Sequence, residues 1–265
     1  MPVPPPFVWG LAVIVILIVG LYLASPYIRK WQARNRPVFY PVATVRGIDV
    51  SHYQEEIDWD CLANSRIDGE PVSFVFIKAT EGKTILDEYF VYNFASARKH
   101  GIIRGAYHVF STKSTPQEQA EFFCNVVELK EKDLFPVLDV EQLGRYTPRQ
   151  MREGILDWMN IVEKHYGVTP ILYTSYSMKK DYLSGPEFDK YPYWIAHYYV
   201  EELAYSGPWK FWQHTDVGTI GGIKSKVDMN VFNGTFSDLL CLTMSKPKFN
   251  EKWSGHVGDS LRRAD

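Results

Sequence analysis

The chain has 265 residues, of which 46% are hydrophobic and 15% aromatic, so it can bury a large core and does not have the composition of a disordered protein. Its length fits one large domain with a short appendage. A formal net charge of -2 and a pI near 6.4 provide no basic field for phosphate groups, so we expect no nucleic-acid partner.

The first element along the chain is an apolar segment. Residues 7–24 read FVWGLAVIVILIVGLYLA and contain no charged side chain. A helix needs about 17–25 such residues to cross a bilayer. The run is longer than the apolar region of a usual signal peptide, and Ser25-Pro26 follows where a cleavage site of small residues would be expected. We therefore predict an uncleaved transmembrane anchor over residues 1–25.

A juxtamembrane linker over residues 26–42 follows the predicted anchor. It carries Arg29, Lys30, Arg34 and Arg36, whereas no lysine or arginine precedes the apolar segment. By the positive-inside rule, this charge distribution favours a cytoplasmic location for the rest of the chain.

Short apolar runs alternate with polar segments through the rest of the chain, and eight of them predict strands. In chain order they read VRGIDVSHY, FVFIKATEG, IRGAYHVF, FPVLDVEQ, ILYTSY, YWIAHY, KFWQHT and KVDMNVF. The first five are joined by segments with apolar residues at a spacing of three and four, which predicts helices that include residues 87–100, 116–130 and 148–166.

The ends of these predicted helices carry typical signals. Thr115-Pro116 and Thr147-Pro148 each combine a capping hydroxyl with proline at the first helical position. Gly101 and Gly167 lie where helices are expected to stop.

Alternating strands and helices predict parallel strands. We therefore expect an α/β fold, a TIM-like barrel of five βα units plus three further strands, over residues 43–244. A polar tail over residues 245–265 is expected to be mobile.

Polar and aromatic residues follow the apolar part of nearly every predicted strand. Functional groups of a parallel barrel lie at the carboxyl ends of its strands, so these residues are the candidate site. They are Asp49 and His52, Lys78 and Glu81, Tyr107 and His108, Asp139 and Glu141, Tyr173, Trp194 and His197, Trp212 and Gln213, and Asp228 and Asn230.

Asp139 and Glu141 are the strongest pair in this set. Residues two apart in a strand point to the same face, so the two carboxyls are expected side by side at the end of an apolar strand. Crowding raises the pKa of one carboxyl, which yields a proton donor next to a partner that stays ionised. Glycosidic bond cleavage needs this combination.

Several of the other candidates have a structural interpretation of equal or greater weight. We favour it for His52, His108, His197 and Tyr107 taken singly, and Lys78 and Glu81 are as well explained by a salt bridge as by a site role. We favour buried, inert thiols for Cys61, Cys124 and Cys241, because their number and spacing fit neither a disulfide framework nor a zinc site. One disulfide bridge is the alternative if the domain lies outside the cytoplasm.

Seven of the motifs, in this order, together resemble glycoside hydrolase family 25, the Chalaropsis-type lysozymes or N-acetylmuramidases. They are GIDVSHYQ, FVFIKATEG, RGAYHVF, FPVLDVE, YWIAHY, the WQ of KFWQHT, and VDMNVF. The resemblance runs from about Arg46 to about Phe236. It implies hydrolysis of the β-1,4 bond between N-acetylmuramic acid and N-acetylglucosamine in peptidoglycan, without metal or organic cofactor.

Carried over motif by motif, the resemblance implies that Glu141 is the general acid and Asp139 the second carboxylate. Asp139 would either position the N-acetyl group of the substrate or act directly on the developing cation. The remaining implied site residues are the cleft acids Asp49 and Asp228 and the substrate-binding residues Tyr107, Tyr173, Trp194 and Gln213.

An enzyme that cuts peptidoglycan must face the wall, so we expect the anchor at residues 7–24 to place the domain outside the cytoplasm, in the cell envelope or periplasm, despite the positive charges that follow it. Two other functions are weighed against hydrolysis. One is a non-catalytic peptidoglycan-binding barrel, and the other is a metal-dependent hydrolase with Asp49, His52, Asp139 and Glu141 as ligands.

Overall fold

The computed structural model describes residues 6–41 and 43–245, and within them the side chains of residues 6–18 and 21 are left out. The tail predicted over residues 245–265 therefore lies almost entirely outside the described residues.

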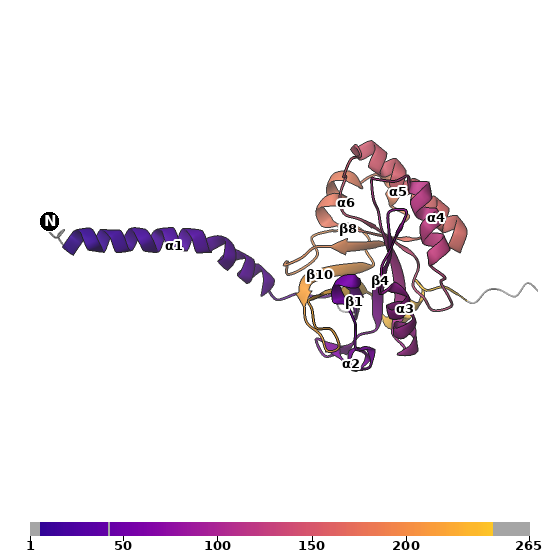
Figure 1. Ribbon diagram of the computed structural model, residues 1–265, viewed down its shortest axis with the longest axis horizontal. Coiled ribbons are helices and arrows are strands. Elements are labelled where there is room, and N and C mark those ends of the chain that lie inside the picture. The colour runs from indigo at the N-terminus through magenta and orange to yellow at the C-terminus, as the bar shows by residue number, and fades with distance from the viewer. Residues whose placement is uncertain (1–5, 42, 246–265) are drawn as a thin grey trace, which may run out of the picture.

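Helix α1 (Pro6–Arg34) extends away from the rest of the molecule (Figure 1), and it contains Pro26 in its interior. In the described part of the chain, no helix is long and apolar enough to cross a membrane. Many of the side chains of residues 7–24 fall outside that description, so the transmembrane anchor stays a prediction.

Eight strands close into a barrel, as predicted. Around the ring they are β1 (Thr44–Val50), β4 (Phe74–Glu81), β6 (Ile103–Val109), β7 (Val137–Val140), β8 (Ile171–Ser175), β9 (Tyr193–Ala196), β10 (Phe211–Gly218) and β11 (Val227–Asn233), and β11 pairs with β1 again. Neighbouring strands are parallel from β1 through to β10. Strand β11 is antiparallel to both of its neighbours, β10 and β1, so the barrel is mixed.

The short strands lie outside the ring. Strands β2 (Arg66–Ile67) and β3 (Glu70–Pro71) form a separate hairpin, and β5 (Ile85–Leu86) pairs with the end of β4.

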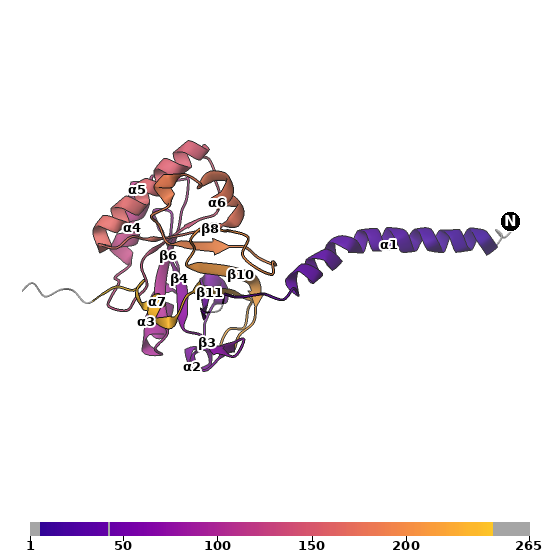
Figure 2. The ribbon, with the colours of Figure 1, turned by 180° about the vertical axis from the view of Figure 1, so that it is seen from behind.

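Five helices follow the first five strands of the ring, which confirms the five predicted βα units. They are α2 (Trp59–Ala63), α3 (Phe90–Lys99), α4 (Pro116–Val126), α5 (Pro148–Tyr166) and α6 (Tyr176–Tyr182), and α7 (Phe236–Leu240) follows β11. Figure 2 shows the barrel from behind, with α4, α5 and α6 together on one side. Two 3-10 turns, η1 (His52–Gln54) and η2 (Pro186–Phe188), complete the elements.

The helix signals in the sequence correspond to observed caps. Thr115 and Thr147 each accept a backbone hydrogen bond in a capping box, and Gly167 ends α5 in the left-handed conformation with φ 71°. Helix α3 begins at Phe90, three residues later than predicted, and the Asp87 carboxylate before it accepts hydrogen bonds from the backbone N–H groups of His52 and Tyr89.

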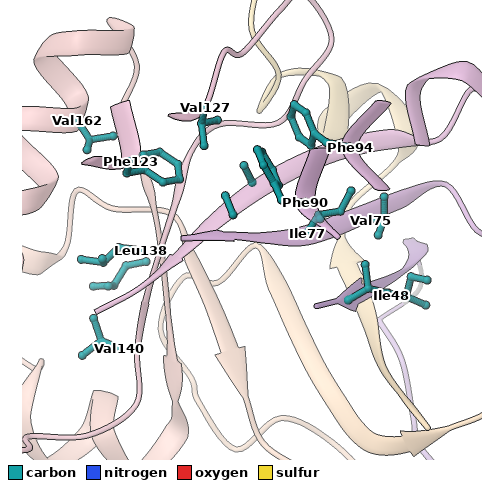
Figure 3. Close-up of a cluster of buried hydrophobic side chains, with 14 of the residues drawn as sticks. Ile48, Val75, Ile77, Phe90, Phe94, Phe123, Val127, Leu138, Val140 and Val162 are labelled. Atoms are coloured by element: carbon teal, nitrogen blue, oxygen red, sulfur yellow. The ribbon is translucent and has the colours of Figure 1, made fainter. Parts of the chain in front are cut away.

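Alternate residues of each strand point to opposite sides of the barrel wall. The outward-facing residues pack under the helices, where Ile48, Val75, Ile77, Leu138 and Val140 contact side chains of α3, α4 and α5 (Figure 3). These residues form the larger of the two buried clusters.

The inward-facing residues fill the barrel with aromatic rings. Phe76 stacks on Trp194 with ring centroids 4.4 Å apart and contacts Phe211 edge to face at 5.0 Å. Gly47 and Gly105 leave room for this packing, since a Cβ on Gly105 would lie 2.6 Å from the Phe76 ring. The interior is therefore a packed core, and only its rim can hold substrate.

The cysteines differ from the expectation of buried thiols. All three are free, and Cys61 and Cys241 are exposed. The prediction was wrong for these two because α2 and α7 are short helices on the surface. Cys124 is partly buried, and burial raises the pKa of its thiol to about 11.

Candidate active site

Four carboxyl groups named from the sequence come together at one rim of the barrel. Asp139 is the third residue of β7 and Glu141 follows the end of that strand. Asp49 on β1 lies directly opposite Asp228 on β11 in the strand register. Asp228 is at the beginning of its strand, and it reaches the rim only because β11 runs antiparallel to its neighbours. The assumption that every site residue lies at the carboxyl end of a strand was wrong for Asp228.

The carboxylate of Asp49 is held by two amide groups. Its Oδ1 accepts one hydrogen bond from Gln213 Nε2 and one from Asn230 Nδ2, both at 2.7 Å. Burial raises the pKa of Asp49 to about 6, although these two hydrogen bonds act in the opposite direction. Asp49 therefore has a fixed orientation and a pKa near neutrality.

Asp49 and Asp228 act on each other. The interaction between the two carboxyls lowers the pKa of Asp49 and raises that of Asp228. Burial, followed by the negative charges of Asp49 and Asp216, raises the pKa of Asp228 to about 9. This raised pKa favours the protonated form of Asp228 at neutral pH.

Asp139 is nearly fully buried, and its Oδ1 has no hydrogen-bond partner among the described residues. Burial raises the pKa of Asp139 well above its usual range, and the charges of Glu141 and Asp49 add to this effect. Buried polar atoms usually have partners, so this buried carboxyl oxygen is an unsatisfied hydrogen-bond acceptor in the site.

Glu141 is the exposed member of the set. Partial desolvation of its carboxyl at the rim raises its pKa, which the positive charge of Lys78 opposes. Lys78 is buried and donates to Glu81 Oε2 at 2.7 Å, so the salt bridge considered from the sequence is present. Its ammonium also acts on Asp139, which gives this salt bridge a role in the site.

The aromatic residues that were predicted to bind substrate are buried in the barrel. Tyr107, Tyr173 and Trp194 are all buried, and Trp194 contacts Tyr173 edge to face with centroids 4.4 Å apart. Trp194 Nε1 donates to Asn230 Oδ1 at 2.8 Å, so its indole orients the amide that holds Asp49. These rings form the floor beneath the carboxyl groups.

Gln213 is also buried beneath the carboxyl groups. Its Oε1 accepts hydrogen bonds from Tyr173 Oη at 2.7 Å and from Tyr198 Oη at 2.6 Å, while its Nε2 donates to Asp49. Two tyrosine hydroxyls therefore determine which way the amide points.

Tyr198 was not among the residues predicted from the sequence. Its position two residues after the inward-facing Ala196 was the available signal.

The histidines lie outside the carboxyl cluster. His108 is buried, with its Nδ1 at 2.7 Å from Thr80 Oγ1 and its Nε2 at 3.2 Å from Gln119 Oε1, and burial lowers its pKa to about 3. His52 pairs with Asp87 at 2.9 Å through Nδ1. No group of three or more histidine, cysteine or acidic side chains in the described part of the chain has the arrangement of a metal site.

His197 and His214 each contact an aromatic side chain. His197 stacks on Tyr176 with ring centroids 4.7 Å apart. His214 alternates with the inward-facing Gln213 on β10 and contacts Tyr40 of the linker at 5.5 Å between centroids. His52 and His108 therefore have hydrogen-bond partners within the fold, in agreement with a structural interpretation, whereas His197 Nδ1 has none among the described residues.

An eight-stranded α/β barrel with four carboxyls of raised pKa at one rim, over a floor of aromatic rings, is a site suited to glycoside hydrolysis. The sequence model of glycosyl hydrolases family 25 matches residues 48–223. The chain belongs to this family, the lysozyme and muramidase family of peptidoglycan hydrolases.

Two curated relatives are similar to this chain over most of its length. The uncharacterized protein YegX of Escherichia coli (strain K12) is 43% identical over 197 residues, which cover 74% of this chain and 72% of YegX. Lysozyme M1 of Streptomyces globisporus is 35% identical over 214 residues, which cover 75% of this chain and 71% of that protein.

Solved structures share the fold. The bacterial lysozyme from Streptomyces coelicolor has a TM-score of 0.69 at 33% identity and is matched over 77% of this chain and 98% of its own. A family 25 glycosyl hydrolase from Bacillus anthracis also has a TM-score of 0.69, at 30% identity, with 79% and 99% covered.

Proposed function

We propose that this chain cleaves the β-1,4 bond between N-acetylmuramic acid and N-acetylglucosamine in peptidoglycan. The observation that carries the proposal is the pair on β7, where an exposed Glu141 with a raised pKa stands beside a buried Asp139. The similarity to proteins named as lysozymes also supports the proposed reaction.

Glu141 is the general acid in this proposal. Its raised pKa keeps a proton on the carboxyl at a pH where an ordinary glutamate has lost it, and its exposure at the rim lets it reach the leaving oxygen. Protonation of the glycosidic oxygen accompanies cleavage of its bond to C1 of N-acetylmuramic acid, and the bonding pair stays on the departing hydroxyl of N-acetylglucosamine.

Asp139 is the second carboxyl. Its unpaired Oδ1 suits the N–H of the substrate's acetamido group, which orients the acetamido carbonyl oxygen toward C1. The acetamido carbonyl oxygen bonds to C1 as the leaving oxygen departs. Water then attacks C1 and gives its proton to the Glu141 carboxylate, while the bond between C1 and the carbonyl oxygen breaks and returns its electron pair to that oxygen. Asp49 and Asp228 lie on the neighbouring part of the rim, where Gln213 and Asn230 fix the Asp49 carboxylate.

The test compares the purified full-length chain with its Glu141→Gln variant on cell-wall material. We expect wild type to release reducing muramic ends, identified by mass spectrometry of the products. The variant should lose about 10²–10⁴-fold in kcat, which is the usual contribution of a general acid.

Glu121→Gln, a change on the exposed side of α4, is the matched control and should retain full activity. An active Glu141→Gln enzyme would overturn the role of Glu141. Binding of the wall by wild type without product release would instead support a non-catalytic barrel.

The same function requires the domain to face the wall. We therefore infer that residues 7–24 anchor the chain in a membrane with the barrel outside the cytoplasm. Two features support this inference, namely the uncharged length of that segment and the exposed apolar side chains Tyr22, Leu23, Tyr27 and Ile28 on α1.

A further inference from the structure

A pocket of about 260 Å³ opens beside Glu141, separate from the Asp49 and Asp228 side of the rim. It is lined by residues 109–113, at and after the end of β6, by residues 141–142 and 144–145, which follow β7, and by Glu81. This space is called the rim pocket below. It is smaller than the roughly 300–1,000 Å³ of pockets that enclose a drug-sized ligand, so it suits one arm of a substrate.

The two loops of the rim pocket are tied together. The backbone N–H of Arg145 donates to Thr112 Oγ1 at 3.0 Å. Gly144 has φ 55°, and a Cβ at this position would lie 2.3 Å from the same hydroxyl oxygen. Only glycine allows the loops to approach this closely, so the contact between them depends on Gly144.

The loop after β6 is also held from below. Gln119, a fully buried residue of α4, accepts the Ser111 N–H through Oε1 at 2.8 Å and donates through Nε2 to the Ser111 carbonyl at 2.8 Å. Because both walls are fixed by hydrogen bonds, the rim pocket is formed before any ligand arrives.

The rim pocket contains two positively charged side chains without a carboxylate partner among the described residues. Lys113 and Arg145 are exposed there, and within the described part of the chain neither lies within 4 Å of a carboxylate. The pocket's own acids are Glu81, which is paired with Lys78, and Glu141, whose raised pKa favours its neutral form. Two cations beside a proton donor attract an anionic group.

The proposed substrate carries such a group on only one of its two sugars. N-acetylmuramic acid has a lactyl ether that ends in a carboxyl, and this carboxyl is either free or linked to a peptide that bears carboxylates of its own. We propose that the rim pocket binds a carboxylate of this muramyl arm through Lys113 and Arg145. This inference rests on the proposed function and assigns two specificity-determining residues to it.

The test uses the double variant Lys113→Ala/Arg145→Ala of the full-length chain. The hydrogen bond between the two loops comes from the backbone N–H of Arg145 to Thr112 Oγ1. Alanine at position 145 keeps this N–H, so the contact between the loops is retained. The matched control, Arg149→Ala/Lys164→Ala, removes the same two charges from the exposed side of α5. Thermal unfolding of all three proteins checks that they are equally folded.

Three substrates separate the sources of the carboxylate. The first is intact peptidoglycan, the second is glycan stripped of peptide by an amidase, which leaves free lactyl carboxylates, and the third is stripped glycan with those carboxylates converted to neutral methylamides. The double variant should show an increase of about tenfold in KM on the anionic substrates with kcat unchanged, the size expected for two exposed charge pairs. On the neutral glycan it should match wild type.

A KM effect on intact peptidoglycan alone assigns the pocket to peptide carboxylates, and an effect on the stripped glycan alone assigns it to the free lactyl carboxylate. An effect on both anionic substrates shows that the pocket accepts either carboxylate. Unchanged KM on both anionic substrates, or an equal increase on the neutral glycan, would overturn the inference. If wild type releases no reducing ends from any substrate, it is the proposed function that fails.

Discussion

At the scale of single residues, the site depends on one carboxylate oxygen, Asp49 Oδ1. Two amide groups donate to it, and each amide is oriented by an aromatic side chain: Gln213 by Tyr173 and Tyr198, and Asn230 by Trp194. Such a fully connected network holds the acid without leaving its buried partners unpaired. Tyr173, Tyr198 and Trp194 therefore act on Asp49 indirectly, because they orient the two amide groups that donate to its carboxylate.

The raised pKa of Asp228 predicts a pH dependence of stability. The pKa of Asp228 rises from 3.8 to about 9 in the folded protein. Below pH 3.8 both folded and unfolded chains hold this proton. Between pH 3.8 and 9 the unfolded chain releases it while the folded chain keeps it, so this carboxyl's contribution to stability falls as pH rises.

We therefore expect Asp228→Asn to have a shallower loss of stability than wild type as pH is raised from 5 to 9. Urea unfolding at a series of pH values measures the difference. Asp181→Asn, a change on the exposed side of α6, should keep the wild-type slope. Parallel slopes for wild type and Asp228→Asn would contradict the assignment of the proton.

At the scale of elements, helix α5 is positioned by its first turn. Thr147 accepts a hydrogen bond from the backbone N–H of Gln150, and the Gln150 side chain accepts from the backbone N–H of Thr147 at 2.9 Å. The helix then packs Trp158 and Met159 against the barrel wall. The cap sets where the helix begins, and it lies just after the loop that carries Glu141 and Arg145.

Thr147→Ala should lower the free energy of unfolding by about 1 kcal/mol, within the range of about 0.5–2 kcal/mol for the loss of an N-cap. Urea unfolding at neutral pH measures this change. Thr219→Ala is the matched control, because the Thr219 side chain is exposed and makes no hydrogen bond within the described residues. Equal stability of Thr147→Ala and wild type would show that water replaces the cap.

At the scale of the whole molecule, the linker meets the barrel close to the site. The backbone N–H of Phe39 donates to the Glu201 carbonyl at 2.6 Å, and Arg34 Nε donates to Tyr199 Oη at 3.4 Å. The loop that follows β9 thus contacts the end of α1 and also carries Tyr198, which binds Gln213. Figure 1 shows α1 leaving the barrel on this side.

The proposed orientation predicts the result of a fusion experiment. A reporter enzyme that is active only outside the cytoplasm, joined to the C-terminus of the full-length chain, should be active in cells. The same fusion without residues 1–25 should be silent, because nothing would then direct the barrel across the membrane. A silent full-length fusion, with a cytoplasmic reporter active in its place, would contradict the location.

Local patterns in the sequence were enough for the five βα units, the caps at Thr115 and Thr147, and the pairing of Asp139 with Glu141. Each of these depends on residues close together in the chain, through the strand period of two or the spacing of a capping box. The resemblance to the family added Asp49 and Asp228 to the predicted site residues. It did not indicate that the two acids face each other across neighbouring strands.

Tertiary structure alone decided the rest of the site. Asp228 faces Asp49 because β11 runs antiparallel, and Tyr107, Tyr173 and Trp194 form a floor because barrel closure brings their strands together. The rim pocket exists because Thr112 meets Gly144 across two loops. These contacts join residues far apart in sequence, and local propensity carries no information about such pairs. The sequence by itself therefore determined which acids were expected at the site, and only the closed barrel decided how they meet and which groups hydrogen-bond to them.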